Sequence, residues 1–262
     1  MKNDNIYEKA KRIFEESNDP KDFVKIESNI ACLETLHYCM EESFKFILLY
    51  GPPGIGKSML LRRFYYEQHS ESLFFYPAPF LSRKELFYRL SMDLLSKKVG
   101  NFIQSISQIP NKTYTILIDE AQMYDENMLE IFRILADTKK IRFILALHTQ
   151  KHDAILAKEH FSTRIYKDIA LTPPTLREFH SYLQKKLFQK GCNELAVAMQ
   201  LSTAKQIYKF TQGNFRQTDK FLYVLFDIMA YFSKNYPSKI KNGKIEKKFI
   251  EMSAIHLGLI NA

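Results

Sequence analysis

The chain has 262 residues and a mass of 30.9 kDa, with 46% hydrophobic and 26% charged residues. These values are ordinary for a globular protein, and they exclude the collagen-like, disulfide-scaffold and intrinsically disordered classes. The length suffices for one large domain, or for a main domain with a smaller one beside it.

The positive charge is concentrated near the C-terminus. The whole chain has 38 basic and 29 acidic side chains, a net charge of +9. Residues 173–262 hold 14 of the basic and only 6 of the acidic side chains, a net charge of +8. Such a segment attracts nucleic acid, anionic lipid or an acidic protein, and a lysine-rich solvated surface is the simpler interpretation.

Three observations predict a cytoplasmic protein. No apolar run reaches the roughly 20 residues of a membrane-spanning helix, and the polar N-terminal residues 1–5 lack the apolar stretch of a secretory signal. The cysteines Cys32, Cys39 and Cys192 show no Cys-x-x-Cys spacing, so we expect reduced thiols. Peripheral association with the inner face of the membrane stays open.

The first two thirds of the chain predict strands that alternate with helices. In chain order we expect helices over residues 6–16 and 28–42, a strand over 44–50, a helix over 57–68, a strand over 73–76, a helix over 82–98, a strand over 114–118, a helix over 127–137, and strands over 142–147 and 165–171. This alternation indicates an α/β fold with a parallel five-stranded sheet.

The pattern changes after Thr172-Pro173-Pro174, where only helical periodicity follows. Helices are expected over residues 175–190, 203–210, 215–232 and 245–257. The sequence therefore predicts two domains, an α/β core with an N-terminal helical extension over residues 1–172 and a basic helical domain over residues 173–262.

The strongest motif is Gly51-Pro52-Pro53-Gly54-Ile55-Gly56-Lys57-Ser58, followed by Met59. It fits G-x-x-x-x-G-K-[ST], the Walker A phosphate-binding loop, and it has the required strand before it and helix after it. The glycines let backbone N–H groups point at phosphates, and the helix adds its N-terminal dipole. Lys57 is expected to reach the β- and γ-phosphates of ATP, and the Ser58 hydroxyl to bind Mg²⁺.

A second motif, Thr115-Ile116-Leu117-Ile118-Asp119-Glu120, is an apolar strand that ends in two carboxylates. We expect this strand to lie beside the P-loop strand, so that its end meets the nucleotide. Asp119 would then support Mg²⁺, as in a Walker B motif. Glu120 would orient and deprotonate the attacking water.

The two motifs together resemble the AAA+ ATPases, and within them the ExeA type of general secretion and pilus biogenesis, which is related to transposition helpers of the TniB type. Further similarity lies in Asp119-Glu120-Ala121-Gln122, in Leu171-Thr172-Pro173 and in Thr211-Gln212-Gly213-Asn214-Phe215-Arg216. The resemblance covers about residues 28–258. It implies an AAA+ core with a helical lid, ATP and Mg²⁺ as cofactors, and a nucleotide-dependent homo-oligomer.

The resemblance also implies roles for four polar residues. His148 or Thr149, after the fourth strand, is the candidate sensor of the γ-phosphate. Arg164 stands where the family often has an arginine finger, which would act on the nucleotide of a neighbouring subunit. Arg216 matches the second sensor of the lid. Each of the four is also compatible with an ordinary solvated side chain.

The resemblance leaves the cellular pathway open, because the aromatic N-terminal segment and the Gly-Gln-Pro-Glu motif of the ExeA type are absent. The first hypothesis is an ATPase that serves a secretion, type IV pilus or DNA-uptake machine, with a protein of that machine as partner. The alternatives are a DNA-binding transposition-helper ATPase, which would grip DNA with its basic lid, and a slow nucleotide switch.

Two weaker patterns have both a structural and a functional interpretation. His148 and His152 are four residues apart, as two metal ligands on one helical turn would be, but no third ligand is evident. Five lysines surround Asn242-Gly243, and they form either a solvated loop or a contact with a phosphate backbone. They are Lys239, Lys241, Lys244, Lys247 and Lys248.

Overall fold

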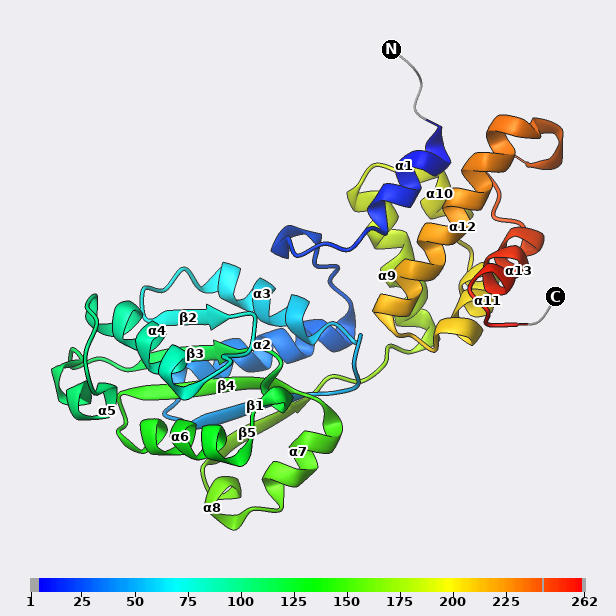
Figure 1. Cartoon of the computed structure of the whole chain (residues 1–262). Helices are drawn as coiled ribbons and strands as arrows, with labels where there is room; N and C mark the ends of the chain where they lie inside the picture. The colour runs from blue at the N-terminus through cyan, green and yellow to red at the C-terminus, as the bar shows by residue number, and fades with distance from the viewer. Residues whose placement is uncertain (1–4, 242, 261–262) are drawn as a thin grey trace. The chain divides into compact units, whose positions relative to one another are not determined.

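The computed structural model describes residues 5–241 and 243–260, so the polar residues 1–4 and Asn242 of the lysine cluster lie outside the described residues. The chain divides into two compact units (Figure 1). The sheet unit comprises residues 31–52 and 57–171, and the helical unit comprises residues 1–30, 53–56 and 172–262.

The sheet unit contains the predicted parallel five-stranded sheet, which confirms the fold class. Its strands are β1 (Phe46–Tyr50), β2 (Leu73–Tyr76), β3 (Tyr114–Ile118), β4 (Ile141–Leu147) and β5 (Ile165–Ala170). They lie in the order β2-β3-β4-β1-β5, and every neighbouring pair is parallel.

Helices cover both faces of this sheet (Figure 1). They are α2 (Glu27–Glu41), which begins in the helical unit, α3 (Lys57–Gln68), α4 (Arg83–Leu95), α5 (Phe102–Ser105), α6 (Glu126–Asp137), α7 (Thr149–Leu156) and α8 (Glu159–Ser162), with short 3-10 turns η2 (Ile106–Gln108) and η3 (Ala121–Met123). The two faces are separate cores because strand side chains alternate. Phe46, Leu48, Ile116 and Ile118 thus share one core with α4 to α6.

One expectation about the sheet is wrong. The strand that ends in Asp119 does not lie beside the P-loop strand, because β4 pairs with both β1 and β3 and separates them. Burial accounts for this order. The residues of β3 and nearly all of those of β4 are buried, whereas β5 exposes four of its six residues, so β5 suits an edge and β4 the centre.

Phe143 is at the centre of the sheet core. It is fully buried on β4, and its ring centroid lies 5.7 Å from that of Phe46 and 5.1 Å from that of Phe132. We expect Phe143→Ala to lower the free energy of unfolding by about 3–5 kcal/mol, because lost transfer energy adds to a new cavity. Chemical denaturation measures this, and a loss below about 1 kcal/mol would show that the site collapses.

The helical unit consists of α1 (Ile6–Ile13), α9 (Leu176–Gln189), α10 (Asn193–Ala198), α11 (Leu201–Thr211), α12 (Phe215–Asn235), α13 (Lys247–His256) and the turns η1 (Pro20–Asp22) and η4 (Pro237–Lys239). The N-terminal segment belongs to this unit rather than to the sheet unit with which the sequence analysis grouped it. The reason is that Tyr7, Ala10 and Phe14 are buried in the core of α9 to α13.

Four short helices were not expected, namely α5, α7, α8 and α10. They have four to eight residues, too few to show a clear apolar period. None of the helices within residues 5–241 and 243–260 is long and apolar enough to cross a bilayer. All three cysteines are buried and free.

Candidate functional site

The Walker A loop leaves β1 at Tyr50 and enters α3 at Lys57. Its backbone has the left-handed turns that only glycine adopts without strain, with φ of +76° at Gly54 and +95° at Gly56. At Gly54 there is no room for a side chain either, because a Cβ would lie 2.4 Å from the Asn214 side-chain oxygen. The loop therefore has the curled backbone that the motif predicts.

Lys57 points back into its own loop. Its Nζ donates to the carbonyl oxygens of Gly51, at 2.8 Å, and Pro52, at 2.9 Å, and the residue is only 8% exposed. This places a desolvated ammonium inside the curl of the P-loop. Phosphate oxygens there would compete with the two carbonyls as charge-assisted acceptors.

Asp119 is a buried carboxylate directly after β3, with 3% of its surface exposed. Burial raises its pKa, and hydrogen bonds from the Ser58 side chain and the Glu120 N–H oppose that rise. Because a bound cation would favour the charged carboxylate, and because hydroxyl and carboxylate oxygens are ligands of Mg²⁺, Ser58 and Asp119 together fit a magnesium ion.

Glu120 adopts a strained backbone conformation, with φ of +55° and ψ of +34°. Such strain at a non-glycine residue is concentrated at functional sites. The amide Nε2 of Gln122 donates to its carboxylate Oε2. Glu120 is thus turned away from the strand direction and held by a partner two residues further along the chain.

Two buried polar atoms near these carboxylates have no hydrogen-bond partner within the described residues. They are Nε of Arg62, whose charge acts on Asp119, and Oε1 of Gln122. Unpaired buried groups are costly, so their presence here is consistent with a site that takes a polar ligand. No role was predicted for either residue from the sequence, although Gln122 belongs to the Asp119-Glu120-Ala121-Gln122 motif.

The end of β4 supplies the sensor candidates. Leu147 pairs with Tyr50 of β1, so the residues after both strands lie at the same edge of the sheet as the P-loop. His148 is the N-cap of α7 and Thr149 is its exposed first residue. Both residues therefore stay candidates for the sensor.

His152, one turn into α7, has a structural role that the sequence did not predict. It is buried, and its ring stacks on Tyr50 with the centroids 3.5 Å apart. Tyr50 immediately precedes the P-loop, so this contact fixes the start of the loop. Among the side chains that the structure describes, which do not include that of His160, no group of three His, Cys, Asp or Glu residues could hold a metal. The pair His148 and His152 gains no third ligand among them.

Arg164 has a clear partner. Its Nε donates to Asp137 at 3.0 Å, and its Nη2 donates to the same carboxylate at 3.1 Å. Lys45 and Arg133 also bind Asp137, at 2.5 Å and 2.7 Å. An arginine finger role would require the guanidinium to leave or extend beyond this pair, and that role stays a prediction.

The same pairs predict a pH effect. Hydrogen bonds from Arg164, and then from Lys45, lower the pKa of Asp137 from 3.8 to about 2. A lowered carboxyl pKa adds stability above pH 3.8, which is lost as the pH falls toward about 2. We therefore expect the melting temperature of the wild type to fall more steeply on acidification than that of Asp137→Asn. Parallel curves would mean that Asp137 contributes no such stability.

Arg216 follows the N-cap Asn214 at the start of α12, within the helical unit. The unit includes the tip of the P-loop, residues 53–56. Asn214 Nδ2 donates to the Pro53 carbonyl at 2.9 Å, and the Arg216 backbone N–H donates to the Gly54 carbonyl at 3.3 Å. The backbone of Arg216, the second-sensor candidate, is therefore hydrogen-bonded to the tip of the P-loop. Asn214 adds a second hydrogen bond to that tip, which the sequence did not predict.

The comparisons with known proteins agree with this geometry. Residues 41–156, which contain both Walker motifs, match the family model described as an AAA domain. No curated protein has a sequence that matches this chain.

Solved structures share the fold at low identity. Cdc6p from Pyrobaculum aerophilum has a TM-score of 0.63 and 15% identity, over 94% of this chain and 70% of that one. The Aeropyrum pernix ORC1 protein, solved with DNA, has a TM-score of 0.60 and 13% identity, over 94% and 69%. A RuvB mutant from Thermotoga maritima has a TM-score of 0.57 and 17% identity, over 89% and 68%.

The family match and the shared fold support an AAA+ P-loop ATPase. They do not single out the ExeA type, which stays a prediction.

Proposed function

We propose that this protein is an ATP hydrolase of the AAA+ type. The observation that supports this most directly is the grouping of a desolvated Lys57 inside a curled P-loop with the Ser58 and Asp119 pair. The P-loop N–H groups and Lys57 would bind the phosphates of ATP.

Each residue of the candidate site has a separate proposed role in ATP hydrolysis. Ser58 and Asp119 would hold Mg²⁺, which supplies charge neutralisation at the β- and γ-phosphates. Glu120 would accept a proton from the water that attacks the γ-phosphorus, and ADP and inorganic phosphate would leave. His148 or Thr149 and Arg216 are proposed to contact the phosphates.

Turnover is proposed to need a second copy of the chain, with Arg164 acting on the nucleotide of its neighbour. A guanidinium suits this role because it stays charged and binds phosphate in a bidentate manner. The side chain of Arg164 is 25% exposed. Its ion pair with Asp137 would position the guanidinium for this role.

For the pathway, we propose a cytoplasmic ATPase that serves a secretion, type IV pilus or DNA-uptake machine, with a protein of that machine as its activator. This proposal rests on the resemblance to the ExeA type. The buried free cysteines are consistent with a reducing compartment.

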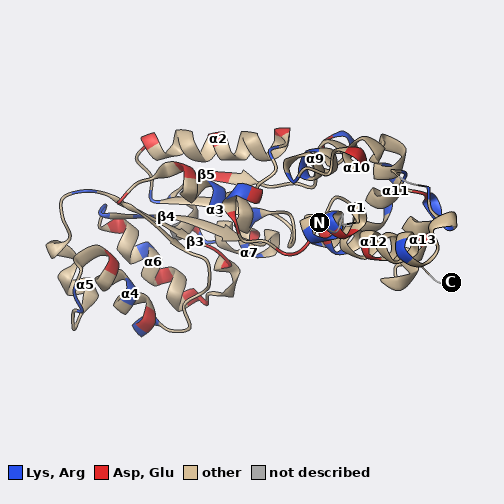
Figure 2. Ribbon diagram, turned by 90° about the horizontal axis from the view of Figure 1, so that it is seen from above, with Lys and Arg blue, Asp and Glu red and all other residues tan. Residues whose placement is uncertain are grey.

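A second candidate is a DNA-associated ATPase of the transposition-helper kind, and the charge of the helical unit favours it. Lysines and arginines recur along α9, α11 and α13 (Figure 2). Four of the six acids of residues 173–262 are already in ion pairs. The pairs are Lys11 with Asp227, Lys186 with Asp219, Lys247 with Glu251 and Lys248 with Glu246. The remaining lysines carry the positive excess.

Steady-state ATP turnover of the purified protein, with and without double-stranded and single-stranded DNA, tests these proposals. Turnover that DNA stimulates strongly would support the DNA-associated candidate. Turnover that DNA leaves unchanged would support a machine ATPase with a protein activator. Saturable binding of ATP without turnover under any of these conditions would contradict the hydrolase proposal and leave a nucleotide switch.

A further inference from the structure

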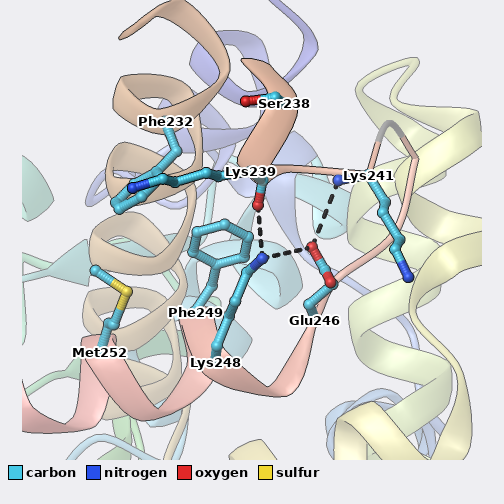
Figure 3. A pocket seen from close by; sticks show the side chains of 8 residues that line it. All are labelled: Phe232, Ser238, Lys239, Lys241, Glu246, Lys248, Phe249 and Met252. Atoms are coloured by element: carbon cyan, nitrogen blue, oxygen red, sulfur yellow. Dashed lines mark hydrogen bonds and ion pairs between the residues drawn. The ribbon is translucent and has the colours of Figure 1, made fainter. Parts of the chain in front are cut away.

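A cavity of about 240 Å³ opens at the end of the helical unit, where α12, η4 and α13 meet (Figure 3). Its walls combine an apolar floor with a charged rim. The lining side chains are Phe232, Phe249 and Met252, together with Ser238, Lys239, Lys241, Glu246 and Lys248.

Glu246, the one acidic residue among those that line the cavity, is already paired within the protein. Glu246 Oε2 lies 3.2 Å from the Lys248 ammonium and accepts a hydrogen bond from the Lys241 backbone N–H at 3.4 Å. Lys248 is further held by the Lys239 carbonyl at 2.5 Å. Three lysines against one acid leave the lining with a net charge of +2, and the ammonium groups of Lys239 and Lys241 supply that excess.

Aromatic rings continue from the cavity wall to the surface. The ring of Phe232 lies 5.3 Å from that of Phe249 and 5.6 Å from that of Tyr236, and Tyr236 lies 6.1 Å from Tyr231. Tyr231 is 56% exposed and Tyr236 is 43% exposed. The Lys239 ammonium lies 5.1 Å from the centre of the Tyr236 ring. Two exposed tyrosine rings therefore lie next to each other beside the cavity, with an ammonium group over one of them.

We infer that this cavity and the tyrosines beside it bind single-stranded nucleic acid. Base faces stack on exposed aromatic rings, and lysines follow the phosphates between them. The cavity has an apolar floor on which one planar base would rest, while Lys239 and Lys241 contact the adjacent phosphates.

The combination of exposed neighbouring rings with nearby lysines favours a single strand over other polyanions. In a duplex the bases are already stacked, so Tyr231, Tyr236 and the apolar floor would be left without partners. An acidic peptide or an anionic bilayer would satisfy the lysines but would not need rings in series. This inference deepens the DNA-associated candidate above, but binding at this cavity does not depend on ATP hydrolysis.

The test is fluorescence anisotropy of the full chain, without nucleotide, with a labelled oligo-dT strand, the same length of duplex, and vesicles of anionic phospholipid. We expect the single strand to bind more tightly than the duplex. Lys239→Ala with Lys241→Ala should weaken that binding about tenfold or more, and should lower the slope of log affinity against log salt by about 1.4, at ~0.7 per phosphate contact.

A second double variant separates the contribution of base stacking from that of charge. Tyr231→Ala with Tyr236→Ala should weaken oligo-dT binding by about tenfold or more and leave the salt slope unchanged. The matched control is Lys97→Ala with Lys98→Ala, two exposed lysines that follow α4 in the sheet unit, which should have little effect.

Three results would overturn the inference. They are equal binding of duplex and single strand, binding to vesicles alone, and an equal loss in the control variant Lys97→Ala with Lys98→Ala. Failure of ATP turnover would not affect this measurement, so the inference and the hydrolase proposal fail separately.

Discussion

Glu120→Gln is expected to abolish most ATP turnover while nucleotide binding is kept. The carboxylate is the proposed proton acceptor for the attacking water, and a positioned general base contributes about 10²–10⁴-fold to a rate. An amide keeps the size and the hydrogen-bonding reach of the side chain but is not basic. We therefore expect turnover to fall by about that factor, with the affinity for ATP within a few-fold of wild type.

The measurement combines steady-state phosphate release with equilibrium binding of a fluorescent ATP analogue. The matched control is Glu71→Gln, which makes the same chemical change at an exposed residue of the sheet unit and should leave both quantities unchanged. Glu120 also accepts a hydrogen bond from Gln122 and has a strained backbone, so the melting temperature is measured in parallel. Turnover of Glu120→Gln equal to wild type would remove Glu120 from the role of base.

The elements that the sequence predicted most accurately are those with a complete local signal. The strand Tyr114–Ile118 and the helix Lys57–Gln68 begin and end at the predicted residues, because an uninterrupted apolar run and a P-loop define them. The helix that begins at Arg83 was predicted from its capping box, and Ser82 is indeed its N-cap, accepting a hydrogen bond from the Glu85 N–H.

What the sequence missed depends on contacts between distant residues. Strand order is one example, since β4 enters between β1 and β3 because of its burial on both faces. The location of α1 is another, because Tyr7 and Phe14 contribute to a core most of whose members follow residue 178. No periodicity within α1 indicates which unit will cover its apolar face.

The candidate site likewise has residues that the sequence predicts and residues that only the structure reveals. The residues of the P-loop and the Asp119-Glu120 pair follow from fixed spacings in the sequence, and the roles predicted for them stay predictions. The partners that hold them do not follow, since Asp137 binds Arg164 across 27 positions and His152 stacks on a tyrosine far away in the chain. Such residues are ordinary in composition and become visible only in three dimensions.

Lys57→Ala is expected to lose most of the affinity for ATP. The ammonium is desolvated and oriented by the carbonyls of Gly51 and Pro52, so little further ordering is needed to bind a phosphate. A hydrogen bond to a charged group contributes about 1.5–3 kcal/mol, so one or two of them correspond to about a 10- to 10⁴-fold loss of affinity. We expect both the affinity and the turnover at subsaturating ATP to fall by at least tenfold.

The control for this variant must separate a lost phosphate contact from a damaged loop. Lys84→Ala removes an exposed lysine of α4 in the same unit and should change neither affinity nor melting temperature. Lys57→Arg keeps the charge but not the compact ammonium that fits between two carbonyls. If Lys57→Ala lowered the melting temperature without weakening ATP binding, the lysine would serve only to tie together the carbonyls of the loop. Loss of binding in both Lys57 variants at an unchanged melting temperature would instead assign it to the phosphates.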